Sequence, residues 1–310
     1  MKKTVDKKMS KIYFAPMEGI TTPTYRKVHK KYYGGIDKYF SPFIVVTSTH
    51  QLKKRETREF DPYEENLVPQ VLTQRGEDFA WAANMLKGMG YKEVNLNLGC
   101  PAATVVTKGK GSGLLRDKDK LRRFFEEVFT ESDLPDISIK TRSGFIYHEE
   151  AEELAEIFAE FPFKEIIIHP RVREEFYQGS PNLDSFNIIK NRAKCPVIYN
   201  GDIFDVNRLT ECYEAEGKEG VMLGRGLLRN PALAEEKEFD PADKRLPAYL
   251  DELYDSYAEV LSGDRDILFK MKELWSYLIT GFHDKKEEYK KLLKSTTAAE
   301  YKQAVRDIIG

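Results

Sequence analysis

Cysteine is scarce in this sequence: the 310 residues include three, Cys100, Cys195 and Cys212. So few cysteines, odd in number, exclude a disulfide framework in a chain of this length, and no two of them have the spacing of a zinc site. No other cluster of metal-ligating residues stands out. We therefore expect reduced thiols, no metal ion and a cytoplasmic protein.

Long apolar runs are also missing. No stretch approaches the roughly 20 apolar residues that cross a bilayer, so we expect no membrane association. Residues 1–10 are basic but lack the apolar core of a signal peptide, and we expect a flexible tail there. The formal net charge is −2, so composition alone does not indicate a nucleic-acid-binding protein.

Short apolar segments, bounded by turn residues, recur up to residue 223. They cover residues 11–15, 38–46, 68–72, 93–98, 136–141, 165–169, 196–200 and 220–223. Most begin about 25–30 residues apart, the length of one strand-helix unit, and amphipathic helical patterns fill the gaps. Eight strands alternating with helices predict an α/β fold, a closed (βα)₈ TIM barrel over residues 11–239. An open doubly wound sheet is the alternative.

The pattern changes after residue 239. Asp240-Pro241 and Leu246-Pro247 mark a linker, and only helical periodicity follows. Two long apolar stripes and two shorter helices, at 284–294 and 297–309, predict a small all-helical domain over residues 240–310. Tyr254, Tyr257 and Trp275 fall on the stripes, so we expect them to pack in its core.

Polar residues follow almost every predicted strand. In a βα barrel the active site lies at the carboxyl ends of the strands. The strand ends carry Pro16-Met17-Glu18, Gln70, Asn97 with Cys100, Lys140 with Arg142, His169 with Arg171, Asn200-Gly201-Asp202, and Gly224-Arg225. A buried amide costs a few kcal/mol unless it is hydrogen-bonded, so this accumulation indicates a pocket for a large polar ligand.

The order of these residues suits FMN. The loops after the seventh and eighth strands commonly form a phosphate site, and there the glycines allow close backbone approach while Arg225 supplies positive charge. Lys140 is placed to lie against a flavin ring and to favour its anionic reduced form, and Gln70 to hydrogen-bond the pyrimidine edge of that ring.

Cys100 is the distinctive reactive group. A free cysteine has a pKa of about 8.5, so near neutral pH the thiol is mostly protonated and can act as an acid. The glycine-rich stretch that follows, Lys108-Gly109-Lys110-Gly111-Ser112-Gly113, is expected to form a mobile lid.

Together these motifs resemble the tRNA-dihydrouridine synthases. Ala-Pro-Met-Glu-Gly, Asn-Leu-Gly-Cys-Pro, Lys-x-Arg, His-x-Arg, Asn-Gly-Asp and Gly-Arg-Gly occur in that family's order, over residues 11–235. The resemblance implies a proton donor at Cys100 and uracil contacts from Asn97, Arg142 and Tyr177. It implies FMN contacts from Pro16, Met17, Glu18, Gln70, Lys140, His169, Asn200, Gly201, Asp202, Gly224 and Arg225. The family usually has glycine where Pro170 stands here, and a proline keeps His169 extended.

The implied reaction is reduction of a tRNA uridine to 5,6-dihydrouridine, with hydride from reduced FMN to C6 and a proton from Cys100 to C5. NADPH or NADH would reduce the flavin. The uridine must be unstacked, and lysines of the helical domain (Lys270, Lys272, Lys285, Lys286, Lys290, Lys291 and Lys294) are candidates to meet phosphates. We expect a monomer with no protein partner. Two alternatives stay open: an FMN barrel acting on a free small molecule, and an RNA-binding protein with a vestigial flavin site. The sequence does not reveal which tRNA position is modified.

Overall fold

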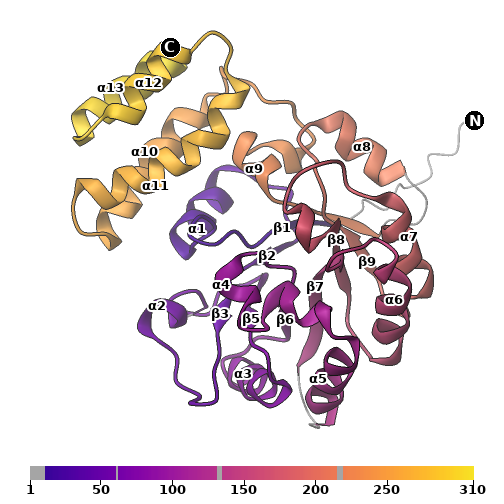
Figure 1. Ribbon diagram of the computed structural model, residues 1–310. Helices are drawn as coiled ribbons and strands as arrows, with labels where there is room; N and C mark the ends of the chain where they lie inside the picture. Colours follow the sequence, from indigo (N-terminus) through magenta and orange to yellow (C-terminus); the bar gives the residue numbers. More distant parts are fainter. Residues whose placement is uncertain (1–10, 61, 131–134, 215–218) are drawn as a thin grey trace, which may run out of the picture.

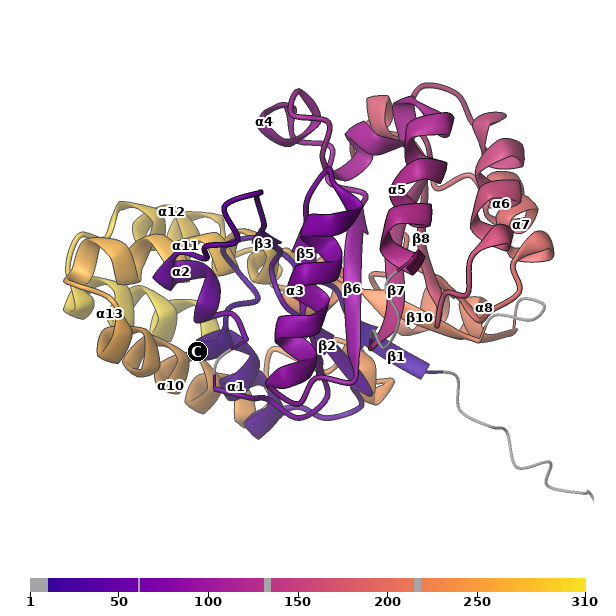
Figure 2. The ribbon, with the colours of Figure 1, turned by 90° about the horizontal axis from the view of Figure 1, so that it is seen from below.

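The computed structural model describes residues 11–60, 62–130, 135–214 and 219–310, so the tail expected over residues 1–10 lies outside the described part. One parallel sheet forms the centre of the molecule, and helices surround it (Figures 1 and 2). Its segments are β1 (Lys11–Phe14), β2 (Lys38–Phe40), β3 (Ile44–Val45), β4 (Leu67–Val68), β5 (Gln70–Leu72), β6 (Glu93–Leu98), β7 (Asp136–Gly144), β8 (Ile166–Val172), β9 (Val197–Tyr199) and β10 (Gly220–Leu223).

The sheet closes on itself. β2 and β3 are two parts of one strand, interrupted around Pro42, and β4 and β5 are two parts of another, interrupted at Pro69. Proline lacks the N–H that a sheet ladder needs, which explains both breaks. β2 pairs with β4 and β3 with β5, while β1 pairs with both β2 and β10. Eight strands therefore form the ring, and the predicted (βα)₈ barrel is confirmed.

Helices of the barrel follow the predicted apolar patterns. In the described residues they are α1 (Pro23–Tyr32), α2 (Lys54–Thr57), α3 (Gly76–Gly88), α4 (Ala103–Val106), α5 (Lys118–Thr130), α6 (Glu150–Glu160), α7 (Leu183–Arg192), α8 (Val206–Glu214) and α9 (Arg225–Arg229), with 3₁₀ turns at η1 (Gly111–Arg116), η2 (Arg173–Glu175) and η3 (Leu233–Glu235). Leu121, Phe124, Phe125 and Val128 of α5 are buried as expected. α1 begins where Thr22 caps it and Pro23 fits the first turn.

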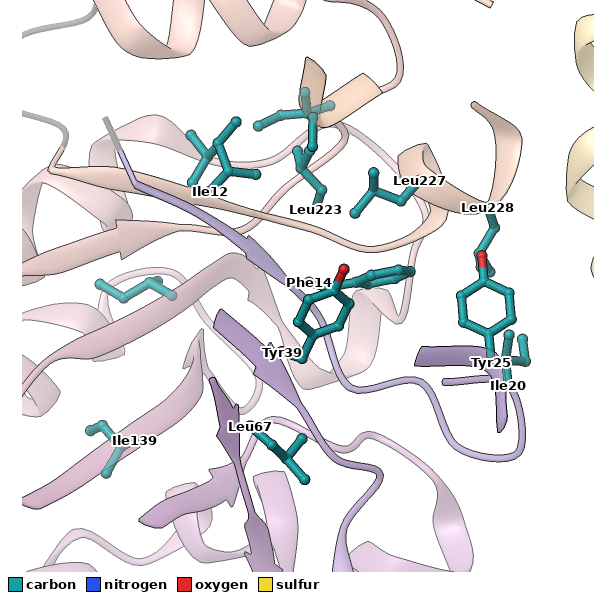
Figure 3. Packing of buried hydrophobic residues seen from close by; sticks show 14 of the residues in the cluster. Ile12, Phe14, Ile20, Tyr25, Tyr39, Leu67, Ile139, Leu223, Leu227 and Leu228 are labelled. Atoms are coloured by element: carbon teal, nitrogen blue, oxygen red, sulfur yellow. The ribbon is translucent and has the colours of Figure 1, made fainter. Parts of the chain in front are cut away.

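Alternation along the strands separates two sets of side chains. Ile12 and Phe14 of β1 belong to the large hydrophobic core cluster, in which the Phe14 ring meets the Tyr25 ring of α1 edge-on with 5.8 Å between the ring centroids (Figure 3). Tyr13, between them, belongs to a smaller cluster inside the barrel. Because successive strand residues face opposite sides, the same alternation decides which polar residues point into the barrel.

The last quarter of the described chain is helical, as predicted. It contains α10 (Arg245–Val260), α11 (Asp264–Leu278), the 3₁₀ turn η4 (Ile279–Gly281), α12 (Lys286–Lys294) and α13 (Ala298–Ile309). α10 lies along α1, where Glu252 accepts from Lys31 at 2.5 Å and from the Tyr32 hydroxyl at 2.7 Å. Tyr254, Tyr257 and Trp275 are buried, so their predicted core role is confirmed.

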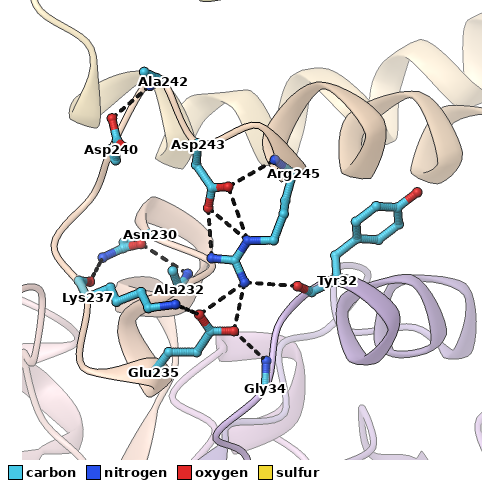
Figure 4. Close-up of polar contacts among 10 residues, drawn as sticks. All are labelled: Tyr32, Gly34, Asn230, Ala232, Glu235, Lys237, Asp240, Ala242, Asp243 and Arg245. Carbon is cyan, nitrogen blue, oxygen red and sulfur yellow. Dashed lines mark hydrogen bonds and ion pairs between the residues drawn. The ribbon is translucent and has the colours of Figure 1, made fainter.

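Arg245 connects the start of α10 to the barrel through ion pairs and a hydrogen bond (Figure 4). Its guanidinium pairs with Glu235 at 2.9 Å and with Asp243 at 2.8 Å, and it donates to the Tyr32 carbonyl at 3.1 Å. Burial alone would raise the pKa of Glu235, but hydrogen bonds from Arg245 and from the Gly34 N–H outweigh it and lower that pKa to about 2. The junction therefore stays charged and paired at neutral pH.

Replacing Trp275 by alanine is expected to lower the free energy of unfolding by about 3–5 kcal/mol. The Trp275 side chain is fully buried, and its indole N–H donates to the Tyr301 hydroxyl at 2.9 Å, joining α11 to α13. Denaturant titration measures the loss. Phe269→Ala on the same helix is the control, since Phe269 is 65% exposed and its loss should change stability by about 0.5 kcal/mol or less. Equal losses of stability in the two variants would contradict the core-packing role of Trp275.

Candidate active site

A cavity of about 540 Å³ opens at the carboxyl ends of the strands. Its lining includes every residue expected from the sequence: Pro16, Met17, Glu18, Gln70, Asn97, Cys100, Lys140, Arg142, His169, Tyr177, Asn200, Gly201, Asp202, Gly224 and Arg225. The structure thus brings together residues from β5 to β8 and from the loops after β1, β6, β8, β9 and β10. The cavity lies in the range of small-molecule and cofactor sites, roughly 300–1,000 Å³.

A chain of amides crosses the barrel interior beneath this cavity. The Asn95 amide donates to the Ser138 hydroxyl at 2.9 Å and accepts from Gln70 Nε2 at 2.8 Å, and Gln70 Oε1 accepts from Asn97 Nδ2 at 2.8 Å. These four side chains come from β5, β6 and β7 and are buried. Each amide has its polar atoms paired, which is how a barrel interior tolerates such residues.

Asn97 ends this chain of amides at Cys100. Its Oδ1 accepts from the backbone N–H groups of Gly99 and Cys100, at 3.0 and 2.9 Å. The predicted uracil contact therefore has only the remaining N–H of this amide available. In the structure Asn97 fixes the turn that carries Cys100.

The expectation of a mobile lid after Cys100 is wrong for its central part. Lys110, Gly111 and Ser112 are buried, and the Ser112 hydroxyl donates to the Cys100 carbonyl at 2.8 Å. Gly111 has a φ of 57°, and a β-carbon there would lie 3.0 Å from the Cys100 carbonyl oxygen. Only glycine suits such a backbone at so close an approach. The segment is a packed support for Cys100.

The Cys100 thiol stays protonated at neutral pH. Burial raises its pKa above the ordinary value, and the opposing effect of the nearby Arg142 charge is smaller. A protonated thiol, partly buried on the cavity wall, can deliver a proton to a ligand in the cavity. The other two thiols do not line the cavity.

Arg142 brings a positive charge to the same wall, and no carboxylate among the described residues pairs with it. It donates to the carbonyl oxygens of Gly99, Val172 and Phe176 at 3.0, 2.8 and 2.7 Å. Burial lowers its pKa to about 10, so the guanidinium remains charged at neutral pH. Phe176 has a φ of 52°, an uncommon backbone state for a bulky residue, and the bond from Arg142 helps to hold it.

Lys140 has no compensating charge among the residues that the structure describes. Within the residues that the structure describes, its Nζ makes no hydrogen bond or ion pair. Burial lowers its pKa to about 8, and the neighbouring Arg142 charge adds to that effect. An unpaired amine on the wall of a deep cavity is suited to an anionic group of a ligand.

His169 is neutral and fixed in orientation. Its Nδ1 lies 2.6 Å from the Asn200 carbonyl, which can only accept, so Nδ1 carries the proton. Nε2 then accepts from Arg171 at 3.3 Å. Burial lowers its pKa well below 6.5, with the charges of Arg142 and Lys140 acting in the same direction. The preceding expectation about Pro170 is confirmed, since β8 continues through it.

The far end of the cavity holds a carboxylate between two arginines. Asp202 pairs with Arg171 and, at 2.6 Å, with Arg225. The Arg225 guanidinium also lies 4.6 Å from the centre of the Tyr177 ring. Arg171 was noted in the sequence only as part of a motif, and its link to Asp202 had no sequence signal because Arg171 lies on β8 whereas Asp202 follows β9.

Helix α11 supplies lining residues that the sequence did not suggest. Glu273 and Tyr277 reach the cavity, next to Lys270, whose Nζ donates to the Gly19 carbonyl at 2.6 Å. An apolar stripe predicts which face of a helix is buried, but not which element covers it. The helical region therefore forms part of the cavity wall.

No group of three or more metal-ligating side chains occurs among the described residues. None of the described helices has the length and apolar character to span a bilayer.

Comparison with solved structures shows the fold alone. Morphinone reductase matches with a TM-score of 0.50 at 12% identity, over 76% of this chain and 88% of that one. Histamine dehydrogenase from Rhizobium sp. 4-9 matches with a TM-score of 0.55 at 11% identity, over 79% of this chain and 49% of that one.

Comparison with other protein sequences shows the family. A probable tRNA-dihydrouridine synthase of Rickettsia conorii is 33% identical over 228 residues, 72% of this chain and 68% of that protein. A probable tRNA-dihydrouridine synthase of Helicobacter pylori is 28% identical over 86% of this chain and 82% of that protein. The family model for dihydrouridine synthase (Dus) matches residues 13–309. This chain therefore belongs to the dihydrouridine synthase (Dus) family.

Proposed function

We propose that the protein reduces a uridine of tRNA to 5,6-dihydrouridine, using FMN. The observation that carries the proposal is the position of Cys100, whose protonated thiol shares one cavity with the uncompensated cations Lys140 and Arg142. Relatives at about one-third identity are named as probable tRNA-dihydrouridine synthases. Hydride addition to C6 of a uracil leaves negative charge on C5 and O4, which calls for an acid and for nearby positive charge.

The cavity suits FMN. Its volume and its division into a cationic centre and a separate rim of glycines and arginine match a flat ring that carries a phosphate. Pro16, Met17, Glu18, Gln70, Lys140 and His169 would surround the ring, and Asn200, Gly201, Asp202, Gly224 and Arg225 the phosphate. When bound, FMN supplies the hydride for C6, and NADPH or NADH is the proposed source of its electrons.

The residues around Cys100 hold and protonate the substrate. Cys100 delivers its proton to C5, and the Arg142 charge stabilises the oxygen on which negative charge develops. Tyr177 is 56% exposed beside both Arg142 and Arg225, where its ring can stack on a base. Asn97 acts by holding the Cys100 turn in place.

The helical region, residues 240–310, is the proposed tRNA-binding domain. Several of the lysines expected to meet phosphates have structural contacts: Lys270, Lys272 and Lys285 donate to backbone carbonyls at 2.6, 2.6 and 2.8 Å. Lys286, Lys291 and Lys294 remain the stronger candidates. Since α11 lines the cavity, RNA held by this region would reach the catalytic residues directly. This disfavours the alternative of a free small-molecule substrate.

Mapping dihydrouridine in tRNA tests the proposal. Purified protein with FMN and NADPH should introduce dihydrouridine into tRNA from cells that lack the protein, at the positions that cells with it modify. Mass spectrometry of nuclease digests locates the product. Full modification of tRNA in the deficient cells would refute the proposal. Action in the cytoplasm, where tRNA functions, belongs to the same proposal, and the monomeric state remains a prediction.

A further inference from the structure

A second cavity, of about 910 Å³, lies next to the catalytic one. Phe43 lines both, so the two cavities share a wall. The second is bounded by α4, η1 and the start of α5, the segments that follow Cys100. Figure 2 shows α4 projecting beyond the carboxyl end of β6, apart from the bundle helices α10 to α13.

Four cations line this second cavity: Lys108, Lys110, Arg116 and Lys120. Asp117 is the one acidic residue in its lining, and its Oδ1 is occupied by the Lys120 backbone N–H at 2.9 Å. Across the part of the chain that the structure describes, none of the four cations forms an ion pair. The lining of this cavity therefore carries a net positive charge, although the protein as a whole is nearly neutral.

Lys110 shows that the charge is built into the fold. Its side chain is only 8% exposed, and its Nζ has the Val46 carbonyl as partner, at 3.2 Å. Burial lowers the pKa of Lys110, and the charge of Lys108 adds to that effect, whereas Asp78 opposes it. Asp78 itself is held by His50 at 3.2 Å. A buried ammonium group without a carboxylate partner is costly unless an anion approaches it.

Residues 110–112, which support Cys100, connect this cavity to the proposed catalytic cysteine. Ser112 and Gly111 contact Cys100 directly, and Lys110 precedes them in the chain. A uridine that enters the catalytic cavity has phosphates on both sides, which must leave along the rim. Cys100 lines the catalytic cavity, and the four cations line the neighbouring cavity that shares Phe43 with it.

We propose, building on the proposed function, that the cavity lined by Lys108, Lys110, Arg116 and Lys120 binds backbone phosphates of the RNA strand beside the target uridine. This phosphate groove would hold the strand on one side of the mouth, opposite the contacts made by the helical region. Lysine and arginine contacts to phosphates depend on salt because they release counterions from the RNA.

The double variant Lys108→Gln/Lys120→Gln tests the phosphate groove, since both side chains reach solvent and the change keeps their length. tRNA binding, measured by fluorescence anisotropy of the FMN-loaded protein at several salt concentrations, should weaken about tenfold near 0.1 M salt. The slope of log affinity against log salt should fall by about 1.4–1.8, since each lost phosphate contact contributes about 0.7–0.9. The KM for tRNA should rise while kcat at saturating tRNA stays unchanged.

Lys164→Gln is the matched control, because Lys164 is exposed and pairs with Asp136 at the opposite end of the barrel. A double variant with the affinity and salt slope of this control would overturn the inference. An increased KM for NADPH with unchanged tRNA binding would also overturn it and would assign the groove to phosphates of the dinucleotide. Failure of the proposed function would look different, since the wild-type protein would then form no dihydrouridine.

Discussion

Replacement of Cys100 by alanine should lower the rate of dihydrouridine formation in tRNA by about 10²–10⁴-fold, the usual contribution of a positioned acid. The reason is that burial keeps this thiol protonated at neutral pH, and that no other thiol lines the cavity. Single-turnover assays with pre-reduced flavin measure the reduction of uridine separately from the reduction of the flavin. Flavin binding and reduction of the flavin by NADPH should stay near wild-type values, because neither needs the proton from Cys100.

Cys195→Ala is the control for this experiment. Cys195 lies before β9, at the end of the barrel away from the cavity, and burial raises its pKa to about 11. Its loss should leave tRNA turnover unchanged. If Cys100→Ala turned over tRNA as fast as Cys195→Ala, the proton would have to come from another group.

Replacement of Lys140 by methionine should slow reduction of the bound flavin by about 10- to 100-fold. A hydrogen bond to a charged group contributes about 1.5–3 kcal/mol, and about 1.4 kcal/mol corresponds to a factor of ten. Lys140 is the cation in the cavity that has no partner among the described residues, so it is free to face the charge that the ring gains on reduction. Stopped-flow bleaching of the flavin absorbance measures the rate.

Lys140 should also make the rate of flavin reduction depend on pH. A lysine is charged below its pKa and neutral above it, and burial brings the pKa of Lys140 down to about 8. The wild-type rate of flavin reduction should therefore fall as the pH rises above about 8, whereas the methionine variant should be slow and flat over that range. A wild-type rate that is constant up to pH 10 would contradict the role given to Lys140.

Much of the site followed from strand periodicity and position. Asn95 and Asn97 are two residues apart on one strand and so must face the same side, and the barrel topology sends both inward with Gln70. The predicted ends of the strands carried the expected lining residues except Tyr177, which the family resemblance supplied, because parallel strands in a barrel end on one face.

The remainder depended on three-dimensional packing that periodicity does not encode. Gly111 and Ser112 belong to a sequence typical of a flexible loop, yet they are buried because they pack against Cys100. The sequence also gave no reason to pair Asp202 with Arg171, or to expect Glu273 and Tyr277 at the cavity. Those contacts arise from how the loops and α11 fold back over the barrel mouth.

The contribution of α11 to the cavity means that the barrel and the helical region share one binding surface. A chain cut after the barrel would keep the groups proposed for the cofactor, but its cavity would lose one side and admit bulk water and unselected ligands. Conversely, changes along α11 can alter which nucleotide fits above the ring without disturbing the groups that carry out reduction. In this architecture, substrate choice and chemistry can therefore diverge independently during evolution.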